Sequence, residues 1–193
     1  MCLAIAARPG VVVPDNHILE GCRSQRDGYG YAYCDLKKKS VVVNKGFFNS
    51  GEFLESYKKD QKDNPDSHFL IHMRSATGGG VTADNTHPFS GKYGAFIHNG
   101  VFFKLGKPNI SDTHHLAKLI HDAPSRALPH LIDSLSEKLG FNKLVFLTPE
   151  NTLHFINEKG GHWLNNVWYS NHAYTTGVTY YGNSTHRNGV CDV

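Results

Sequence analysis

Cys2 is the first residue whose type and position could support catalysis. Removal of Met1 would leave a residue that carries both a thiol and a free α-amino group. Such an amine has a pKa of about 8, so near neutrality part of it is unprotonated and can accept the proton of its own thiol. Cys2 could therefore act as a nucleophile that brings its own base. The plainer interpretation is a buried structural cysteine near a chain end, because free cysteines are among the most buried residues.

Four further segments place polar groups where an apolar strand ends or a helix starts. They are HMRSATG at 72–78, NTHPF at 85–89, AFIHNG at 95–100 and SDT at 111–113. Loops held by a rigid scaffold commonly build active sites. Taken singly, Asn99-Gly100 is typical of a hairpin turn, SDT of a helix N-cap, and Arg74 of a surface ion pair. Only the ordered set, headed by a cysteine at position 2, indicates catalysis.

Between Cys2 and about Ile120, this ordered set resembles the class II glutamine amidotransferases, the branch of the Ntn hydrolases with an N-terminal cysteine, and especially their short single-domain members. The resemblance implies that Cys2 is the nucleophile and that its α-amine accepts and later returns a proton. It also implies that Asn99 and Gly100 form the oxyanion hole. An Asn amide and a Gly backbone N–H can both point at the oxygen of a tetrahedral intermediate.

The resemblance further implies which residues bind the substrate. Arg74 is expected to bind an α-carboxylate, with Thr77 adding a hydroxyl, because arginine presents a planar fork of donors. Asp112 is expected to bind the α-ammonium, since an ionised carboxylate only accepts hydrogen bonds. The turn at 26–30, with Arg26 and Gly28, aligns with the loop that covers the substrate in the family.

The implied reaction releases ammonia and glutamate from glutamine through a γ-glutamyl thioester, and needs no metal or organic cofactor. Ser75 and Gly78 replace a large aromatic residue and a histidine of the larger relatives. This leaves open a γ-glutamyl compound with a larger amine as leaving group. A non-catalytic subunit that binds glutamine or delivers ammonia is a further alternative. A domain of this family would occupy nearly all 193 residues, so any synthase that receives the ammonia is expected to be a separate subunit.

Thirteen histidines raise the question of a metal site. His114 and His115 with His121, or His162 with His172, could bind zinc, but the chain has neither an HExxH motif nor a Cys/His pattern with zinc-ligand spacing. A GxSxG nucleophile elbow is also missing. We therefore expect no metal and no Ser-His-Asp chemistry.

The composition excludes other classes. Apolar residues make up 39% and charged residues 19%, which is typical of a globular protein. The net charge of +3 is too small to indicate nucleic acid, although Tyr29, Tyr31 and Tyr33 with the lysines at 37–39 keep that alternative open. No apolar run approaches the roughly 20 residues of a membrane helix, and the start of the chain does not read as a signal peptide. We expect a cytoplasmic protein without a membrane partner.

The elements that must position these residues are strands around a central pair of helices. The pattern predicts strands at 2–7, 31–35, 41–44, 68–73, 93–98, 143–147, 152–156, 167–170 and 173–178. It predicts a helix at about 15–23 with Asp15 or Asn16 as its N-cap, helices at 50–59 and 111–121, and another after Pro124 that ends near Gly140. Without regular strand–helix alternation, this order favours an α+β fold. The resemblance adds the four-layer αββα sandwich of two mostly antiparallel sheets, with one domain over 1–193. The polar composition of residues 183–193 predicts a flexible tail.

Overall fold

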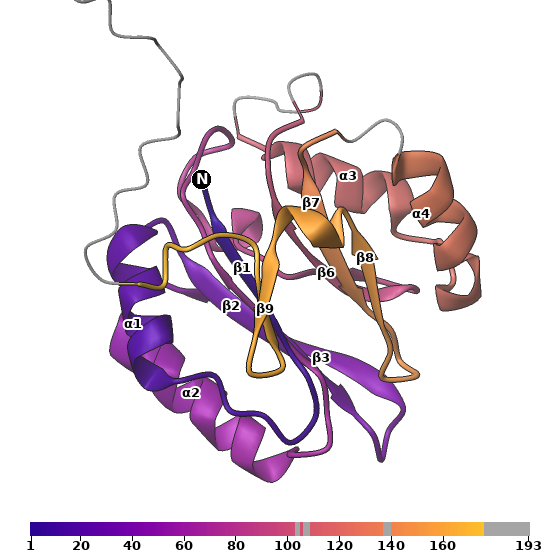
Figure 1. Ribbon diagram of the computed structural model, residues 1–193. Coiled ribbons are helices and arrows are strands. Elements are labelled where there is room, and N and C mark those ends of the chain that lie inside the picture. The colour runs from indigo at the N-terminus through magenta and orange to yellow at the C-terminus, as the bar shows by residue number, and fades with distance from the viewer. Residues whose placement is uncertain (103–104, 106–108, 137–139, 176–193) are drawn as a thin grey trace, which may run out of the picture.

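The computed structural model describes residues 1–102, 105, 109–136 and 140–175. Within these residues the chain forms two antiparallel β-sheets with helices packed against them (Figure 1). The six-stranded sheet has the strand order β3-β2-β4-β1-β10-β9, and the four-stranded sheet has the order β5-β6-β7-β8. The predicted α+β class with antiparallel sheets is confirmed.

The elements lie close to the segments that the sequence predicts. The strands are β1 (Leu3–Ala7), β2 (Tyr29–Asp35), β3 (Ser40–Phe47), β4 (Phe69–Met73), β5 (Phe89–Gly91), β6 (Gly94–Asn99), β7 (Lys143–Leu147), β8 (Leu153–Ile156), β9 (His162–Leu164) and β10 (Val167–Tyr169). The α-helices are α1 (Asp15–Ser24), α2 (Ser50–Asp63), α3 (Asp112–Ile120) and α4 (Leu128–Ser136). Short 3₁₀ turns lie at η1 (Ala83–Asn85), η2 (Ser125–Ala127) and η3 (Glu158–Gly160).

The first strand lies in the middle of the six-stranded sheet, between β4 and β10. All five of its residues are buried, which explains why the strand is apolar throughout instead of alternating. Leu3 and Ile5 pack on the side of the helices α1 and α2, while Ala4 and Ala6 face the other sheet. Because β1 is central and buried, the sheet fixes the position of Cys2, the residue just before it.

Three apolar clusters hold the sheets and helices together. The first packs the six-stranded sheet against α1 and α2, through side chains such as Ile18 and Phe53. The second joins the two sheets, where small alanines of β1 meet larger residues such as Val145. The third packs the four-stranded sheet against α3 and α4, through residues such as Leu116 and Leu128. Figure 1 shows the same arrangement, with α1 and α2 on the outer side of one sheet and α3 and α4 on the outer side of the other.

Two of the helices begin at polar caps, and the sequence predicts one of these caps, at 111–113. The Ser111 side chain accepts a hydrogen bond from the N–H of His114 at 3.1 Å and caps α3. The Asn49 side chain accepts from the N–H groups of Gly51 and Glu52 and caps α2. At α1 the expected cap by Asp15 or Asn16 is wrong, because Pro14 occupies that position and makes no side-chain cap hydrogen bond.

The sequence reading misses β5 and β9, and it misplaces one strand. Each of these two strands has only three residues, which is too short for a periodic pattern. The strand predicted at 173–178 is wrong in its described part, because residues 173–175 form a turn in which the Thr175 N–H donates to the His172 carbonyl. Residues 176–178 and the predicted tail at 183–193 lie outside the described residues.

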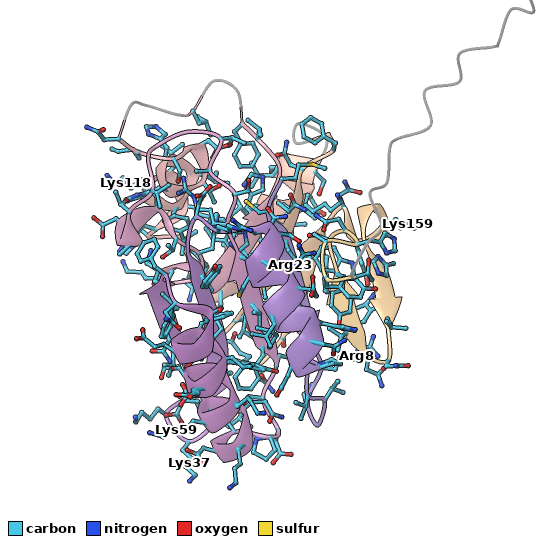
Figure 2. The ribbon with its side chains drawn as sticks, turned by 90° about the vertical axis from the view of Figure 1, so that its left-hand side faces the viewer. Arg8, Arg23, Lys37, Lys59, Lys118 and Lys159 are labelled. Carbon is cyan, nitrogen blue, oxygen red and sulfur yellow. The ribbon has the colours of Figure 1, made fainter. Side chains whose placement is uncertain are left out.

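In the described part of the chain, the helices are too short or too polar to span a membrane. Among the basic residues that Figure 2 labels, Arg23 lies in α1, Lys37 and Lys59 lie near one end of the molecule, and Lys118 lies near the other.

Candidate active site

A pocket of about 280 Å³, its open mouth included, lies beside the ends of β1, β4 and β6 and the start of α3. It is lined by Cys2, Arg74, Ser75, Thr77, Gly78, His87, His98, Gly100, Ser111, Asp112 and Thr113. Five of the eight residues that the sequence nominated, Cys2, Arg74, Thr77, Gly100 and Asp112, therefore share this pocket. Asn99, Arg26 and Gly28 do not line it.

The Cys2 thiol is held between neighbouring strands. Sγ of Cys2 lies 3.4 Å from the backbone N of Ser75, which donates to it, and 3.5 Å from the Ser75 carbonyl oxygen. On the other side, the Asn171 amide donates to the carbonyl oxygen of Cys2 at 2.8 Å. Met1, the residue that must be removed to free the α-amine of Cys2, is 73% exposed and projects into solvent.

Burial raises the pKa of the Cys2 thiol. The hydrogen bond from the Ser75 backbone, the positive chain terminus and the Arg74 guanidinium all act against this effect, but burial dominates. A thiol in such surroundings needs a base close by before it can attack. While Met1 is attached, the nitrogen of Cys2 is a peptide nitrogen and cannot act as that base. Removal of Met1 would create the base on the same residue.

Arg74 follows β4 and is buried. Its Nη1 donates to the Gly80 carbonyl and its Nη2 to the Gly78 carbonyl, each at 2.7 Å. Within the described residues no carboxylate forms an ion pair with this guanidinium. Two of the five N–H donors of an arginine are thus engaged by the loop, and the others are available to an anion in the pocket. Burial lowers the pKa of Arg74, and the charges of Cys2, Asp27 and Asp112 act in the opposite direction.

The turn before β2 fixes the position of this arginine. The backbone N–H of Arg74 donates to the Gly28 carbonyl, and the backbone N–H of Asp27 donates to the Arg74 carbonyl, each at 2.9 Å. The Asp27 carboxylate accepts from the Ala76 N–H at 2.7 Å. Gly28 has φ +112°, and a Cβ there would lie 2.5 Å from Cγ2 of Thr86. Gly28 therefore shapes the backbone that holds Arg74, from outside the pocket.

Arg26 lies in the same turn but points elsewhere. It is exposed, and its Nε donates to the Arg23 carbonyl at 2.9 Å. Thr77, in contrast, is exposed at the rim of the pocket and lines it. Of these two predicted substrate contacts, Thr77 therefore lies at the pocket and Arg26 does not.

Asn85 connects the glycine loop at 78–80 to the start of α3. Its amide donates to the Gly79 carbonyl, and its Oδ1 accepts from the Ser111 N–H at 3.0 Å. Gly79 has φ +76°, and a Cβ at that position would meet the Ser111 backbone at 2.3 Å. The two segments that carry Arg74 and Asp112 are therefore fixed relative to each other.

Asp112 is the first residue of α3 and is half-buried. Its Oδ1 accepts from the Thr113 N–H at 2.8 Å, and its Oδ2 accepts from the Phe102 N–H at 2.6 Å. These contacts keep the carboxylate at the N-terminus of the helix, where the helix dipole favours a negative charge. Each carboxylate oxygen can accept more than one hydrogen bond, so Asp112 can also bind a cation in the pocket.

Asn99 and Gly100 follow one another at the end of β6. The Asn99 amide is buried, and its Nδ2 donates to Oγ of Ser170 at 2.8 Å. Gly100 lines the pocket, and a Cβ there would overlap with Oδ1 of Asn142 and lie 2.8 Å from Nε2 of His98. Only glycine fits at this position, because its neighbours come from the core and cannot retreat.

Three buried histidines pack together at the pocket, where His87 and His98 line the wall and His72 lies behind them. Nε2 of His72 lies 2.9 Å from the His98 carbonyl, and the ring centroids of His72 and His87 are 3.9 Å apart. The His98 ring contacts Oγ1 of Thr113 at 2.7 Å and Oδ1 of Asn142 at 2.8 Å. Burial lowers the pKa of His72 to about 3 and lowers the pKa of His87 and His98 as well, so all three rings are neutral near pH 7. Among the described residues no group of three or more His, Cys, Asp or Glu side chains is arranged to hold a metal ion.

Sequence reasoning missed the residues that support the site. Ser170 and Asn171 contact Ala4 and Cys2 from the far end of the described chain, through the Ser170 hydroxyl and the Asn171 amide. Asn142 contacts His98 from the residue before β7. None of these three residues belongs to a local motif, so only the fold reveals them. Asp27 lies in the turn at 26–30, where the sequence pointed to its neighbour Arg26 instead.

Comparison with known families agrees with the geometry. The family described as the class II glutamine amidotransferases matches residues 19–158, which is more than half of the chain. The protein therefore belongs to the class II glutamine amidotransferases, and its family indicates a glutamine amidotransferase type of function. A search of curated proteins found no match.

Proposed function

We propose that this protein is an amidohydrolase in which Cys2, once Met1 has been removed, attacks the side-chain amide of glutamine. The supporting observation is that the Cys2 thiol, the Arg74 guanidinium and the Asp112 carboxylate share one small pocket. Arg74 and Asp112 lie inside the residues that match the family, whereas Cys2 lies before them. The role of Cys2 therefore rests on its place in the pocket and on the chemistry of an N-terminal cysteine.

The charges in the pocket suit a free amino acid. Arg74 retains donors for an α-carboxylate, and Thr77 lies at the rim of the same pocket. Asp112 retains acceptor capacity for an α-ammonium. A positive and a negative group in one pocket match the two charges of an amino acid head, which leaves its side chain to reach Cys2.

The reaction then takes four steps. The α-amine of Cys2 accepts the thiol proton, and the thiolate attacks the amide carbon of glutamine. We expect the resulting oxyanion to receive hydrogen bonds from the Gly100 N–H and from the second hydrogen of Asn99 Nδ2, the first being directed at Ser170. The contact with Asn99 stays a prediction, because this residue does not line the pocket. The intermediate collapses when the α-ammonium gives its proton to the departing nitrogen, which releases ammonia. Water then adds to the γ-glutamyl thioester, glutamate leaves, and the thiol is restored.

The remaining features of the proposal follow from the resemblance and from the packing. The layers of helix, sheet, sheet and helix support the αββα sandwich of the Ntn hydrolases over one domain, and the clusters between the layers favour it. We propose no cofactor, a cytoplasmic location, and a separate synthase subunit if the ammonia is used for synthesis. Contact of Arg26 with the substrate stays a prediction, because its side chain lies outside the pocket.

The proposal is tested by comparing substrates on the purified chain. We expect ammonia release from glutamine, with glutamate as the other product. Faster cleavage of γ-glutamyl amides of larger amines would instead favour a γ-glutamyl hydrolase with the same nucleophile. Binding of glutamine without turnover, until a second protein is added, would favour an ammonia-delivering subunit. Absence of both binding and turnover with all of these compounds would contradict the proposal.

A further inference from the structure

His87 lies in the wall of the Cys2 pocket, and neither of its ring nitrogens has a hydrogen-bond partner among the described residues. The residue is 3% exposed and lines the pocket. Both Nδ1 and Nε2 are buried and unpaired. Burying a polar atom without a partner is unfavourable, so such an atom in a pocket wall points to a small ligand that pairs with it.

His72 adds a third unpaired nitrogen beside the first two. The His98 carbonyl can only accept, so the contact at 2.9 Å requires that Nε2 of His72 carries the hydrogen. In a neutral ring Nδ1 is then an acceptor, and it too is buried and unpaired. With the ring centroids of His72 and His87 only 3.9 Å apart, the two rings together offer one N–H donor and two acceptors.

The chemistry at this wall restricts the ligand. Phe89 lies edge-on to His87, with ring centroids 4.9 Å apart, and packs beside it. A neutral imidazole offers one donor and one acceptor, so a ligand that pairs with either nitrogen of His87 must be able to accept or donate a hydrogen bond. Water and ammonia, the two small molecules of the proposed reaction, can do both.

We propose that His87, with the His72 ring packed against it, forms a subsite for one molecule of ammonia or water in the wall of the Cys2 pocket. The inference rests on the proposed function, in which ammonia leaves the intermediate and water attacks the thioester. His87 acts as a positioning residue that holds the small nucleophile or leaving group by hydrogen bonds. It takes no part in the transfer of the acyl group itself.

The test measures how much of the γ-glutamyl thioester reacts with water and how much reacts with hydroxylamine. Glutamine is turned over in the presence of a fixed concentration of hydroxylamine, and the ratio of γ-glutamyl hydroxamate to glutamate is determined. Hydroxylamine nitrogen attacks the thioester carbon, the carbon–sulfur bond breaks, and the proton lost from nitrogen ends on the Cys2 thiol. This ratio does not depend on the folded fraction of the enzyme, so loss of stability alone leaves it unchanged.

His87→Leu should change the product ratio at least about threefold and lower kcat about tenfold or more. His87→Gln keeps a donor and an acceptor and should restore part of both. If His87→Leu does not fold, His87→Met carries the same test with a more adaptable apolar side chain. His68→Leu is the matched control, because His68 also has a buried unpaired nitrogen but precedes the opposite end of β4 and is not part of the pocket wall.

The two possible ligands give different signatures in the leucine variant. Accumulation of the γ-glutamyl thioester in the intact mass assigns the subsite to water, whereas slow ammonia release without accumulation assigns it to ammonia. A ratio and a kcat that both equal those of the wild type would overturn the inference. A wild-type chain that releases no ammonia and forms no thioester would overturn the proposed function itself, which is a separate result.

Discussion

The backbone N–H of Ser75 donates to Sγ of Cys2 at 3.4 Å, so the end of β4 holds the thiol that precedes β1. The two strands are antiparallel neighbours, and Leu3 pairs with Met73 in their register. The residue that follows Cys2 thus faces the residue that precedes Arg74. The pairing of two buried strands sets the position of both groups, and a change of register would move them to the wrong face of the sheet.

Replacement of Cys2 by alanine should abolish turnover without unfolding the protein. The nucleophile is lost, and we expect ammonia release from glutamine to fall at least about 10⁴-fold. The matched control is Cys34→Ala, because Cys34 is also a free cysteine but its buried thiol contacts the Pro149 carbonyl, outside the pocket. Ammonia release at the wild-type rate in the Cys2 variant would rule out the mechanism.

Replacement of Arg74 by lysine should weaken recognition of the α-carboxylate. A lysine has one ammonium in place of the fork, so it cannot contact the Gly78 and Gly80 carbonyls and a carboxylate in the same way. We expect kcat/KM for glutamine to fall about 10- to 100-fold. Activity on 4-aminobutanamide, which lacks the α-carboxylate, is the internal control and should change much less. An equal loss with both substrates would show that Arg74 only supports the loop.

Replacement of Asp112 by asparagine should separate its structural role from its binding role. Asparagine keeps one oxygen for the Thr113 N–H but loses the acceptor for the Phe102 N–H, so the free energy of unfolding should fall by about 1–3 kcal/mol. The loss of charge should raise KM for glutamine about tenfold, with a smaller effect on kcat. Thermal unfolding and steady-state kinetics measure the two effects. An unchanged KM would contradict the proposed contact with the α-ammonium.

Acid should destabilise the protein through its buried histidines. Burial lowers the pKa of His72 to about 3, whereas in the unfolded chain a histidine titrates near 6.5. At pH values below about 6.5, His72 binds a proton in the unfolded chain but stays neutral in the folded protein. The free energy of unfolding therefore falls as the pH falls toward 3. Between pH 7.5 and 5 His72 alone should account for about 2 kcal/mol.

Urea unfolding at these two pH values measures the effect. His72→Gln should reduce the loss between pH 7.5 and 5 by about 2 kcal/mol, because glutamine does not titrate. The control His121→Gln removes an exposed histidine and should leave the difference nearly unchanged. An identical pH dependence in wild type and His72→Gln would mean that His72 is not neutral in the folded state.

The parts of the site that follow from local sequence could be predicted, and the parts that depend on distant contacts could not. Arg74, Gly100 and Asp112 each stand where a strand ends or a helix begins, and such boundaries leave local signals. Ser170 and Asn171 act on the start of the chain only because β10 pairs with β1. One sequence does not reveal that pairing, so their roles remained invisible.

The same contrast explains the errors in the secondary structure. The segment at 173–178 is rich in residues that favour strands, which made a strand the natural prediction. In the structure Tyr174 stacks on Tyr169, with ring centroids 3.9 Å apart, and packs against His17. Side-chain packing in a turn therefore overrides the propensity of the described part of that segment.

The central claim is that Cys2 becomes the N-terminal residue and is the nucleophile. The most direct test is intact-mass and N-terminal analysis of the protein after incubation with an electrophilic glutamine analogue. The account predicts loss of Met1 and a single covalent adduct on Cys2, with Cys22 and Cys34 unmodified. Full activity in protein that retains Met1, or an adduct on another residue that abolishes activity, would contradict it.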